Sequence, residues 1–133
     1  QRALKYKTGD VVSASLNHKS GLSTQITAIL KTPHYQRITI WGENGWVELV
    51  DSSHPDTPGP SFMKIVMNDG SVKEENFDWT DTVSANINNF VDAINKEDEY
   101  IFKDIEKFQN IAVLEAIYQS SLSKKSIDVE TFN

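Results

Sequence analysis

The sequence contains no cysteine. This absence excludes a disulfide framework, a zinc site with thiolate ligands and a cysteine nucleophile, and it fits a cytoplasmic location. The sequence also has no run of about 18 apolar residues, so we expect no membrane-spanning helix and no membrane partner. The glycine-rich dinucleotide and phosphate loops are missing, and no serine lies in a Gly-x-Ser-x-Gly elbow. The common nucleotide-binding and hydrolase motifs are therefore excluded.

Positive charge is scarce. The chain has 13 lysine and arginine residues against 19 acidic residues, a net charge of −6 and an isoelectric point near 5.0. Nucleic-acid backbones are bound by clustered basic side chains, and here the only such cluster is Arg2, Lys5 and Lys7, which we interpret as a solvated chain end. The sequence predicts no nucleic-acid partner.

Residues that could form a catalytic or metal site are few and dispersed. The three histidines, His18, His34 and His54, all fall in predicted turns or loops. None has a partner at the spacing of a His-Glu-x-x-His metal site. From this pattern we predict no metal site, no cofactor-binding residue and no catalytic residue in the chain.

The pattern of apolar residues indicates one α+β domain spanning residues 1–133. The first two thirds read as antiparallel hairpins, the clearest of which has the turn Gly42-Glu43-Asn44-Gly45. Residues 83–94 and 104–122 then show helical periodicity, with Asp81 or Thr82 and Asp104 as N-caps. We therefore predict a mostly antiparallel, open-faced sheet with helices packed on one face.

Alternation along the central hairpin predicts two different sheet faces. One face carries the aliphatic side chains Ile38, Ile40, Val47 and Leu49, which we expect Phe90, Ile94, Phe108 and Ile111 to cover. The opposite face carries Thr39, Trp41, Trp46 and Glu48. Two tryptophans on an uncovered face are typical of an interface or a ligand groove. Cover by a loop or another strand is the alternative.

Several segments of this chain resemble the C-terminal domain of the Gfo/Idh/MocA oxidoreductases, the relatives of glucose–fructose oxidoreductase and inositol dehydrogenase. The most specific segment is Leu114-Glu115-Ala116-Ile117-Tyr118-Gln119-Ser120, and the resemblance closes at Ile127-Asp128-Val129, which we expect to be a short strand. Similar segments include Gly9–Ala14, Thr32–Arg37, Ile40–Glu48 and Asn89–Ile94. The resemblance extends from Gly9 to Val129.

The resemblance implies a two-domain enzyme that depends on NAD or NADP. Its Rossmann domain binds the dinucleotide, and its C-terminal domain contributes the substrate pocket and the oligomer interface. The family's glycine-rich fingerprint, its Glu-Lys-Pro segment and its Asp-x-x-x-His pair are all missing here. No catalytic residue can therefore be transferred to this chain. We expect the chain alone to be inactive and to bind no dinucleotide, because hydride transfer needs a positioned nicotinamide and an acid or base.

Within this reading, the chain is the C-terminal part of a longer protein, which fits its start at Gln1 without a methionine. We expect its partners to be its own Rossmann domain and further copies of itself.

The candidate substrate-facing residues are Thr32, His34, Tyr35 and Arg37, whose polar groups suit the hydroxyls of a sugar or polyol; a polar surface loop is the alternative. A free-standing α+β module that binds a small ligand or a protein is the rival function, and a small enzyme of unrelated fold is a remote third. The substrate and the choice between NAD and NADP stay open.

Overall fold

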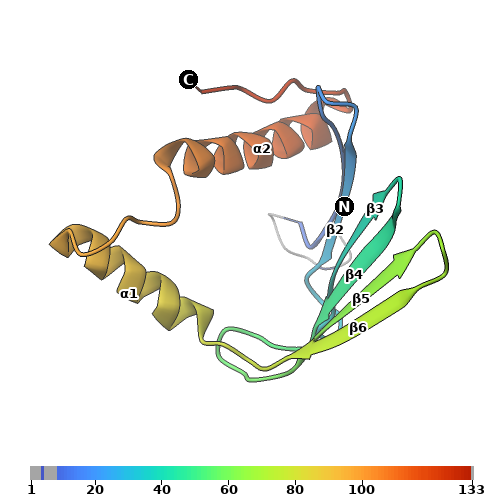
Figure 1. Ribbon diagram of the computed structural model, residues 1–133. Helices are drawn as coiled ribbons and strands as arrows, with labels where there is room; N and C mark the ends of the chain where they lie inside the picture. The colour runs from blue at the N-terminus through green and yellow to red at the C-terminus, as the bar shows by residue number, and fades with distance from the viewer. Residues whose placement is uncertain (1–3, 5–8, 133) are drawn as a thin grey trace. The chain divides into compact units, whose positions relative to one another are not determined.

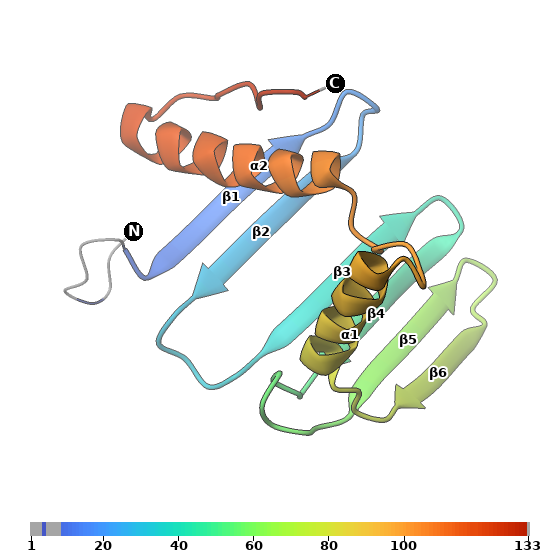
Figure 2. The same cartoon turned by 90° about the vertical axis from the view of Figure 1, so that its left-hand side faces the viewer.

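The computed structural model describes Leu4 and residues 9–132. The basic cluster Arg2, Lys5 and Lys7 lies outside the described residues. The described chain forms six strands followed by two helices, shown in Figures 1 and 2. The strands form a two-stranded sheet, β1–β2, and a four-stranded sheet, β3–β4–β5–β6, and all pairs are antiparallel. This architecture confirms the α+β prediction and divides the predicted sheet into two.

The chain divides into two compact units. The first comprises the described residues up to Ile29 and those from Asn88 onward, and the second comprises Leu30–Ile87. The division falls within helix α1 (Thr82–Asn95). The expectation of a single domain over residues 1–133 stays a prediction.

The first unit contains a hairpin and a long helix. Strands β1 (Val11–Asn17) and β2 (Ser23–Ile29) pair in register from Val11 opposite Ile29 to Asn17 opposite Ser23. Helix α2 (Asp104–Ser123) is the long helix of the same unit. Ala112 and Ala116, one turn apart on α2, are only 9% and 8% exposed. They are the two apolar side chains that the described part of the chain buries.

Both ends of α2 are fixed by short-range contacts. The N-cap is Lys103, one residue earlier than predicted, and its backbone N–H donates to Glu106 Oε2 at 3.0 Å. At the C-terminus Lys124 adopts φ 59°, and its N–H donates to the Ser120 carbonyl at 2.9 Å. The following segment runs back along the helix (Figures 1 and 2), with Phe132 and Phe108 ring centroids 5.8 Å apart.

The short strand predicted at Ile127–Val129 is wrong, because these described residues have no strand assignment. Just before them, the Ser120 hydroxyl donates to the Lys125 carbonyl at 2.7 Å. An apolar-polar-apolar triplet is too short to distinguish a strand from an extended segment lying along a helix.

The connection between the two helices is held by Asn89 on α1. Its Nδ2 donates to the Glu99 carbonyl at 3.1 Å, and its Oδ1 accepts from the Ile101 N–H at 3.0 Å. Between these residues the Tyr100 ring contacts Phe90 and Phe102 edge-on, with centroids 5.5 and 5.7 Å away. The Asn89 amide therefore satisfies one backbone carbonyl and one backbone N–H of a loop that forms no strand pairing.

We predict that Asn89→Ala destabilises the chain by about 1–3 kcal/mol, because it removes two hydrogen bonds worth roughly 0.5–1.5 kcal/mol each. The matched control is Asn88→Ala, which makes the same change in helix propensity at the exposed neighbouring position. Urea unfolding followed by circular dichroism gives the difference. Equal midpoints for the two variants would show that the amide does not hold the connection.

The second unit is the four-stranded sheet with its connecting loops. Its strands are β3 (Gln36–Gly42), β4 (Gly45–Asp51), β5 (Ser61–Met67) and β6 (Val72–Phe77). The predicted central hairpin is confirmed, with Gly42 opposite Gly45 and Trp41 opposite Trp46. Because side chains alternate along a strand, this register places Thr39, Trp41, Trp46 and Glu48 on one face, which we call the Trp face.

The opposite face carries Ile38, Ile40, Val47 and Leu49, and we call it the Ile face. Ile38 and Ile40 remain 57% and 55% exposed. On α2, Phe108 and Ile111 remain 58% and 65% exposed. The residues expected to cover the Ile face belong to the first unit, so this expectation stays a prediction.

Helix α1 begins as its sequence predicts. Asp81 caps it: the carboxylate accepts from the Ser84 N–H at 2.9 Å and from the Ser84 hydroxyl at 2.7 Å, and the Asp81 carbonyl accepts from the Ala85 N–H at 3.0 Å. These contacts satisfy amide groups that the first helical turn cannot pair internally. Neither of the described helices has the length and apolar character needed to cross a bilayer.

Candidate functional site

The second unit contains a polar pocket at the end of its sheet. Its volume is about 170 Å³. It is lined by the start of β3, the end of β4, the loop after β4 and the segment that leads from β6 into α1. We call it the Asp51 pocket; the lining residues are Gln36, Asp51, Ser53, His54, Pro55, Trp79, Thr80 and Thr82.

Asp51, the last residue of β4, is held by hydrogen bonds within this unit. Its Oδ1 accepts from the Ser53 N–H at 2.7 Å and from the Ser61 hydroxyl at 3.1 Å. Hydrogen bonds from the Ser53 backbone and side chain lower the pKa of Asp51 from its usual 3.8; the Ser61 hydroxyl and the nearby His34 imidazole act in the same direction. The carboxylate is therefore ionised at neutral pH, and its orientation is fixed.

We predict that Asp51 contributes to acid denaturation. Its folded-state pKa lies below the unfolded value of 3.8. A depressed folded pKa gives stability that is fully present above the unfolded pKa and is lost as the pH falls through the folded pKa. Melting temperatures measured from about pH 5 down to about pH 2 should therefore fall less steeply for Asp51→Asn than for the unaltered chain. Parallel curves would contradict this assignment, and Glu43→Gln, in the exposed β3–β4 turn, serves as the control.

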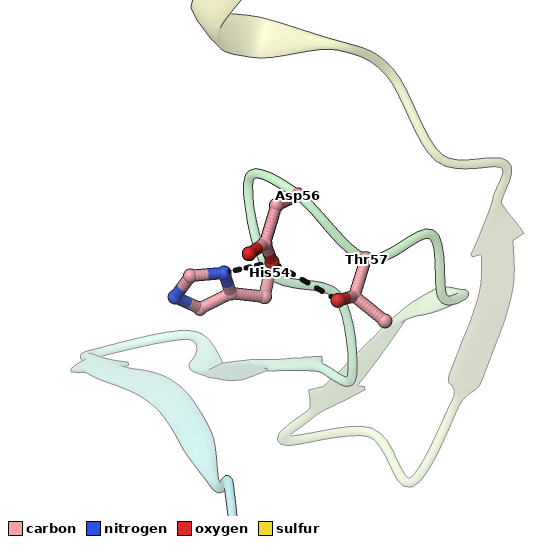
Figure 3. Close-up of polar contacts among 3 residues, drawn as sticks. All are labelled: His54, Asp56 and Thr57. Atoms are coloured by element: carbon pink, nitrogen blue, oxygen red, sulfur yellow. Dashed lines mark hydrogen bonds and ion pairs between the residues drawn. The ribbon is translucent and has the colours of Figure 1, made fainter.

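The loop after β4 presents His54 with a carboxylate partner, as Figure 3 shows. Nδ1 of His54 lies 2.5 Å from Asp56 Oδ1, and the Thr57 hydroxyl donates to the same carboxylate oxygen at 3.0 Å. The backbones of His54 and Thr57 also exchange two hydrogen bonds of 2.9 Å. This short turn holds the imidazole through Nδ1, so that Nε2 is the ring nitrogen left for a ligand.

Of the four candidate substrate-facing residues, His34 is the one connected to the Asp51 pocket. Its ring meets the His54 ring edge-on, with centroids 6.1 Å apart. Thr32 is exposed, and Tyr35 is 66% exposed. Arg37 belongs to a second cluster of side chains, away from the pocket lining. Its guanidinium lies 3.5 Å from Glu48 Oε1 and 5.9 Å from the centroid of the Tyr35 ring. The segment therefore contributes to two separate polar groups.

Arg37 belongs to the polar part of the Trp face. Glu48 Oε1, which pairs with Arg37, also accepts from the Thr39 hydroxyl at 3.4 Å. One strand further, Lys64 lies opposite Glu48 and pairs with Glu74 at 2.8 Å. The Trp face is thus an apolar pair, Trp41 and Trp46, beside a row of alternating charges.

Sequence reasoning missed most of the pocket. His54 is a loop histidine as predicted, and its side chain stays 58% exposed; Asp51, Gln36 and Trp79 are not among the predicted site residues. No motif could have identified them, because they are brought together by antiparallel register: Gln36 and Asp51 are cross-strand partners. Trp79 joins them because it follows β6, whose last residue, Phe77, lies opposite Ser61 at the same sheet end.

Chemically, the Asp51 pocket offers hydroxyl, amide, imidazole and carboxylate groups beside one indole. Such groups orient a small polyhydroxy ligand by hydrogen bonds. Complete small-molecule sites usually enclose about 300–1,000 Å³, so this pocket has the size of a part of such a site. Among the residues that the structure describes, no group of three or more potential ligands is placed to hold a metal ion.

Comparison with known proteins gives one match. A family model described as "Oxidoreductase family, C-terminal alpha/beta domain" (GFO_IDH_MocA_C) matches residues 2–129 of the 133-residue chain. No curated protein sequence and no solved structure matches the chain.

Proposed function

The chain belongs to the Gfo/Idh/MocA oxidoreductase family, as its C-terminal α/β domain, and on this premise we propose that it supplies part of the substrate pocket and the oligomer interface of an NAD(P)-dependent oxidoreductase. The substrate class that we propose is a sugar or a polyol. The observation that carries the proposal is the Asp51 pocket, a concave polar site at one end of the sheet. The cytoplasmic location expected from the lack of cysteine is kept as part of the proposal.

In this proposal the nicotinamide dinucleotide is held by another domain of the protein and accepts or gives the hydride. The residues of this chain bind and orient the substrate. Gln36, Thr80 and Thr82 are suited to hydrogen-bond hydroxyl groups, and His54, held by Asp56, is suited to accept or donate through Nε2. The chain by itself performs no hydride transfer.

The Trp face supports the second half of the proposal. Trp41 is 73% exposed, and it lies directly opposite Trp46 in the β3–β4 register. A large aromatic patch with charged neighbours is the composition that protein interfaces use. We propose that two copies of the chain meet through this face.

The DNA on the 5′ side of the Gln1 codon tests the proposal. We expect an in-frame segment that encodes a Rossmann domain with a Gly-x-Gly-x-x-Gly fingerprint after its first strand. A start codon and promoter immediately before Gln1 would instead support a free-standing binding module.

Activity of the full-length protein then tests the pocket. Polyols and sugars are screened by reduction of NAD⁺ or NADP⁺. With an active substrate, His34→Ala and His54→Ala are each expected to lower kcat/KM by about tenfold or more, a loss of about 1.4 kcal/mol of transition-state binding. Lys19→Ala, on the exposed β1–β2 turn, is the control. If kcat/KM of both histidine variants stays within about threefold of the unaltered enzyme (under ~0.7 kcal/mol), the pocket does not take part in the reaction.

A further inference from the structure

The charges around the Asp51 pocket are unbalanced. Its lining includes the carboxylate of Asp51 but no lysine or arginine. Asp56, which pairs with the lining residue His54, adds a second carboxylate beside it. Negative potential in a concave site favours cationic ligands and repels anions. A phosphate or carboxylate on a ligand is therefore disfavoured here.

Asp51 lines the pocket in an orientation that hydrogen bonds fix. The Ser53 N–H and the Ser61 hydroxyl both donate to Oδ1, and the Ser53 side chain also hydrogen-bonds the carboxylate. Because the carboxylate is already oriented by the protein, a donor from a ligand does not have to order the side chain first.

The pocket also has an aromatic wall and neutral acceptors. Trp79 is half-buried and lines the pocket together with Thr80 and Thr82. An indole face attracts a cation within about 6 Å of its centre. An ammonium group carries three donors, and the lining residues Asp51, Gln36, Thr80 and Thr82 all carry acceptor oxygens.

We propose that the Asp51 pocket binds the ammonium group of an amine-bearing polyhydroxy substrate, with Asp51 as the counter-ion and Trp79 as the aromatic wall. The polyhydroxy part rests on the proposed function. The amine is inferred from the charge and shape of the pocket. An uncharged analogue that carries a hydroxyl in place of the amine is expected to bind more weakly, and a carboxylate analogue more weakly still.

Three ligands with the same carbon skeleton test this proposal: glucamine, sorbitol and gluconate, which carry a terminal ammonium, hydroxyl and carboxylate. Each is titrated into the 133-residue chain at pH 7 and low ionic strength, and the indole N–H signal of Trp79 is followed by NMR. A charge-assisted hydrogen bond predicts that glucamine binds about tenfold or more tightly than sorbitol, and gluconate most weakly. Equal affinities, or binding that leaves the Trp79 signal unchanged, would overturn the proposal.

Variants separate the contribution of Asp51 from that of the rest of the surface. Asp51→Asn is expected to reduce the preference for glucamine over sorbitol to less than about twofold. Glu75→Gln, which removes a carboxylate of β6 that pairs with Lys73 at 3.0 Å, should keep the full preference. If Asp51→Asn does not fold, Trp79→Leu provides the second test, with an expected loss of about fivefold in glucamine affinity. Unchanged glucamine affinity in a folded variant contradicts the proposal.

The tests of the amine site and of the proposed function can fail separately. If the upstream DNA encodes a Rossmann domain but the three ligands bind with equal affinity, the proposed oxidoreductase function stands and the proposed amine site is rejected. A start codon before Gln1 together with a tenfold glucamine preference would retain the amine site in a free-standing binding module.

Discussion

Gly45→Ala is expected to lower the melting temperature of the chain by about 10 °C. Gly45 has φ +153°, and a Cβ built there lies 2.1 Å from the Val66 carbonyl oxygen and 2.9 Å from the Met67 Cα. Both obstacles are backbone atoms of β5, so no rotamer change can relieve the clash. Overpacking alone destabilises by typically 1–3 kcal/mol, and the strained φ adds roughly 1–2 kcal/mol. About 3 kcal/mol corresponds to the stated shift for a chain of this size.

The reason for this close approach is that two hairpin turns dock on each other. Asn68, in the β5–β6 turn, donates from its backbone N–H to the Asn44 carbonyl at 3.0 Å and from Nδ2 to the Glu43 carbonyl at 2.5 Å. These bonds pull the β3–β4 turn against β5, and only a residue without a side chain fits at Gly45. The docking therefore depends on this glycine.

Gly42→Ala is the matched control for this prediction. Gly42 lies at the other end of the same two-residue turn, and its built Cβ meets only the Gly45 carbonyl oxygen at 3.8 Å, an ordinary van der Waals contact. Its melting temperature should stay within about 3 °C of the unaltered chain. Differential scanning calorimetry measures both. If Gly45→Ala melts as high as Gly42→Ala, β5 does not pass the turn as closely as described.

The sequence was informative where a local pattern determines local structure. Alternation on either side of the turn Gly42–Gly45 predicted which residues of β3 and β4 share a face, and the register confirms that Trp41 and Trp46 lie on one face. Of the two predicted caps, Asp81 and Thr82, the structure confirms Asp81, because a carboxylate before a helical stretch satisfies its free amides. These predictions depend on contacts within a few residues, and such contacts can be recognised in a single sequence.

The sequence was uninformative where the structure depends on partners distant along the chain. The docking of Asn68 on Glu43 joins residues 25 positions apart, and the Asp51 pocket joins β3, β4 and the segment before α1. The buried alanines of α2 were not distinguished from its other apolar residues, since periodicity marks a face but not the depth of burial. The strand predicted at Ile127–Val129 failed for the same reason: an apolar triplet does not specify what it packs against.

Trp41→Lys is expected to convert a dimer of this chain into a monomer. Trp41 is 73% exposed on an ordered strand, next to its cross-strand partner Trp46. An aromatic side chain offers about 150–250 Å² of mostly apolar surface, worth roughly 25 cal/mol per Å² when buried. A two-fold axis uses the same patch on both copies, so one substitution removes two anchors. At about 2 kcal/mol for each anchor, the dissociation constant rises by about a thousandfold.

Ile40→Lys is the control that makes this experiment specific. Ile40 lies on the same strand, one residue from Trp41, and is 55% exposed, but it points to the Ile face. It adds the same charge with a similar change in exposed apolar area. Light scattering at tens of micromolar should then report a dimer or larger for the unaltered chain and for Ile40→Lys, and a monomer with unchanged circular dichroism for Trp41→Lys. A monomeric unaltered chain would contradict the assignment of the Trp face as the interface, and so would dissociation by Ile40→Lys instead of Trp41→Lys. The reason is that a dimer formed through the Trp face must be weakened by a lysine at position 41, on that face. It must tolerate a lysine at position 40, on the opposite face.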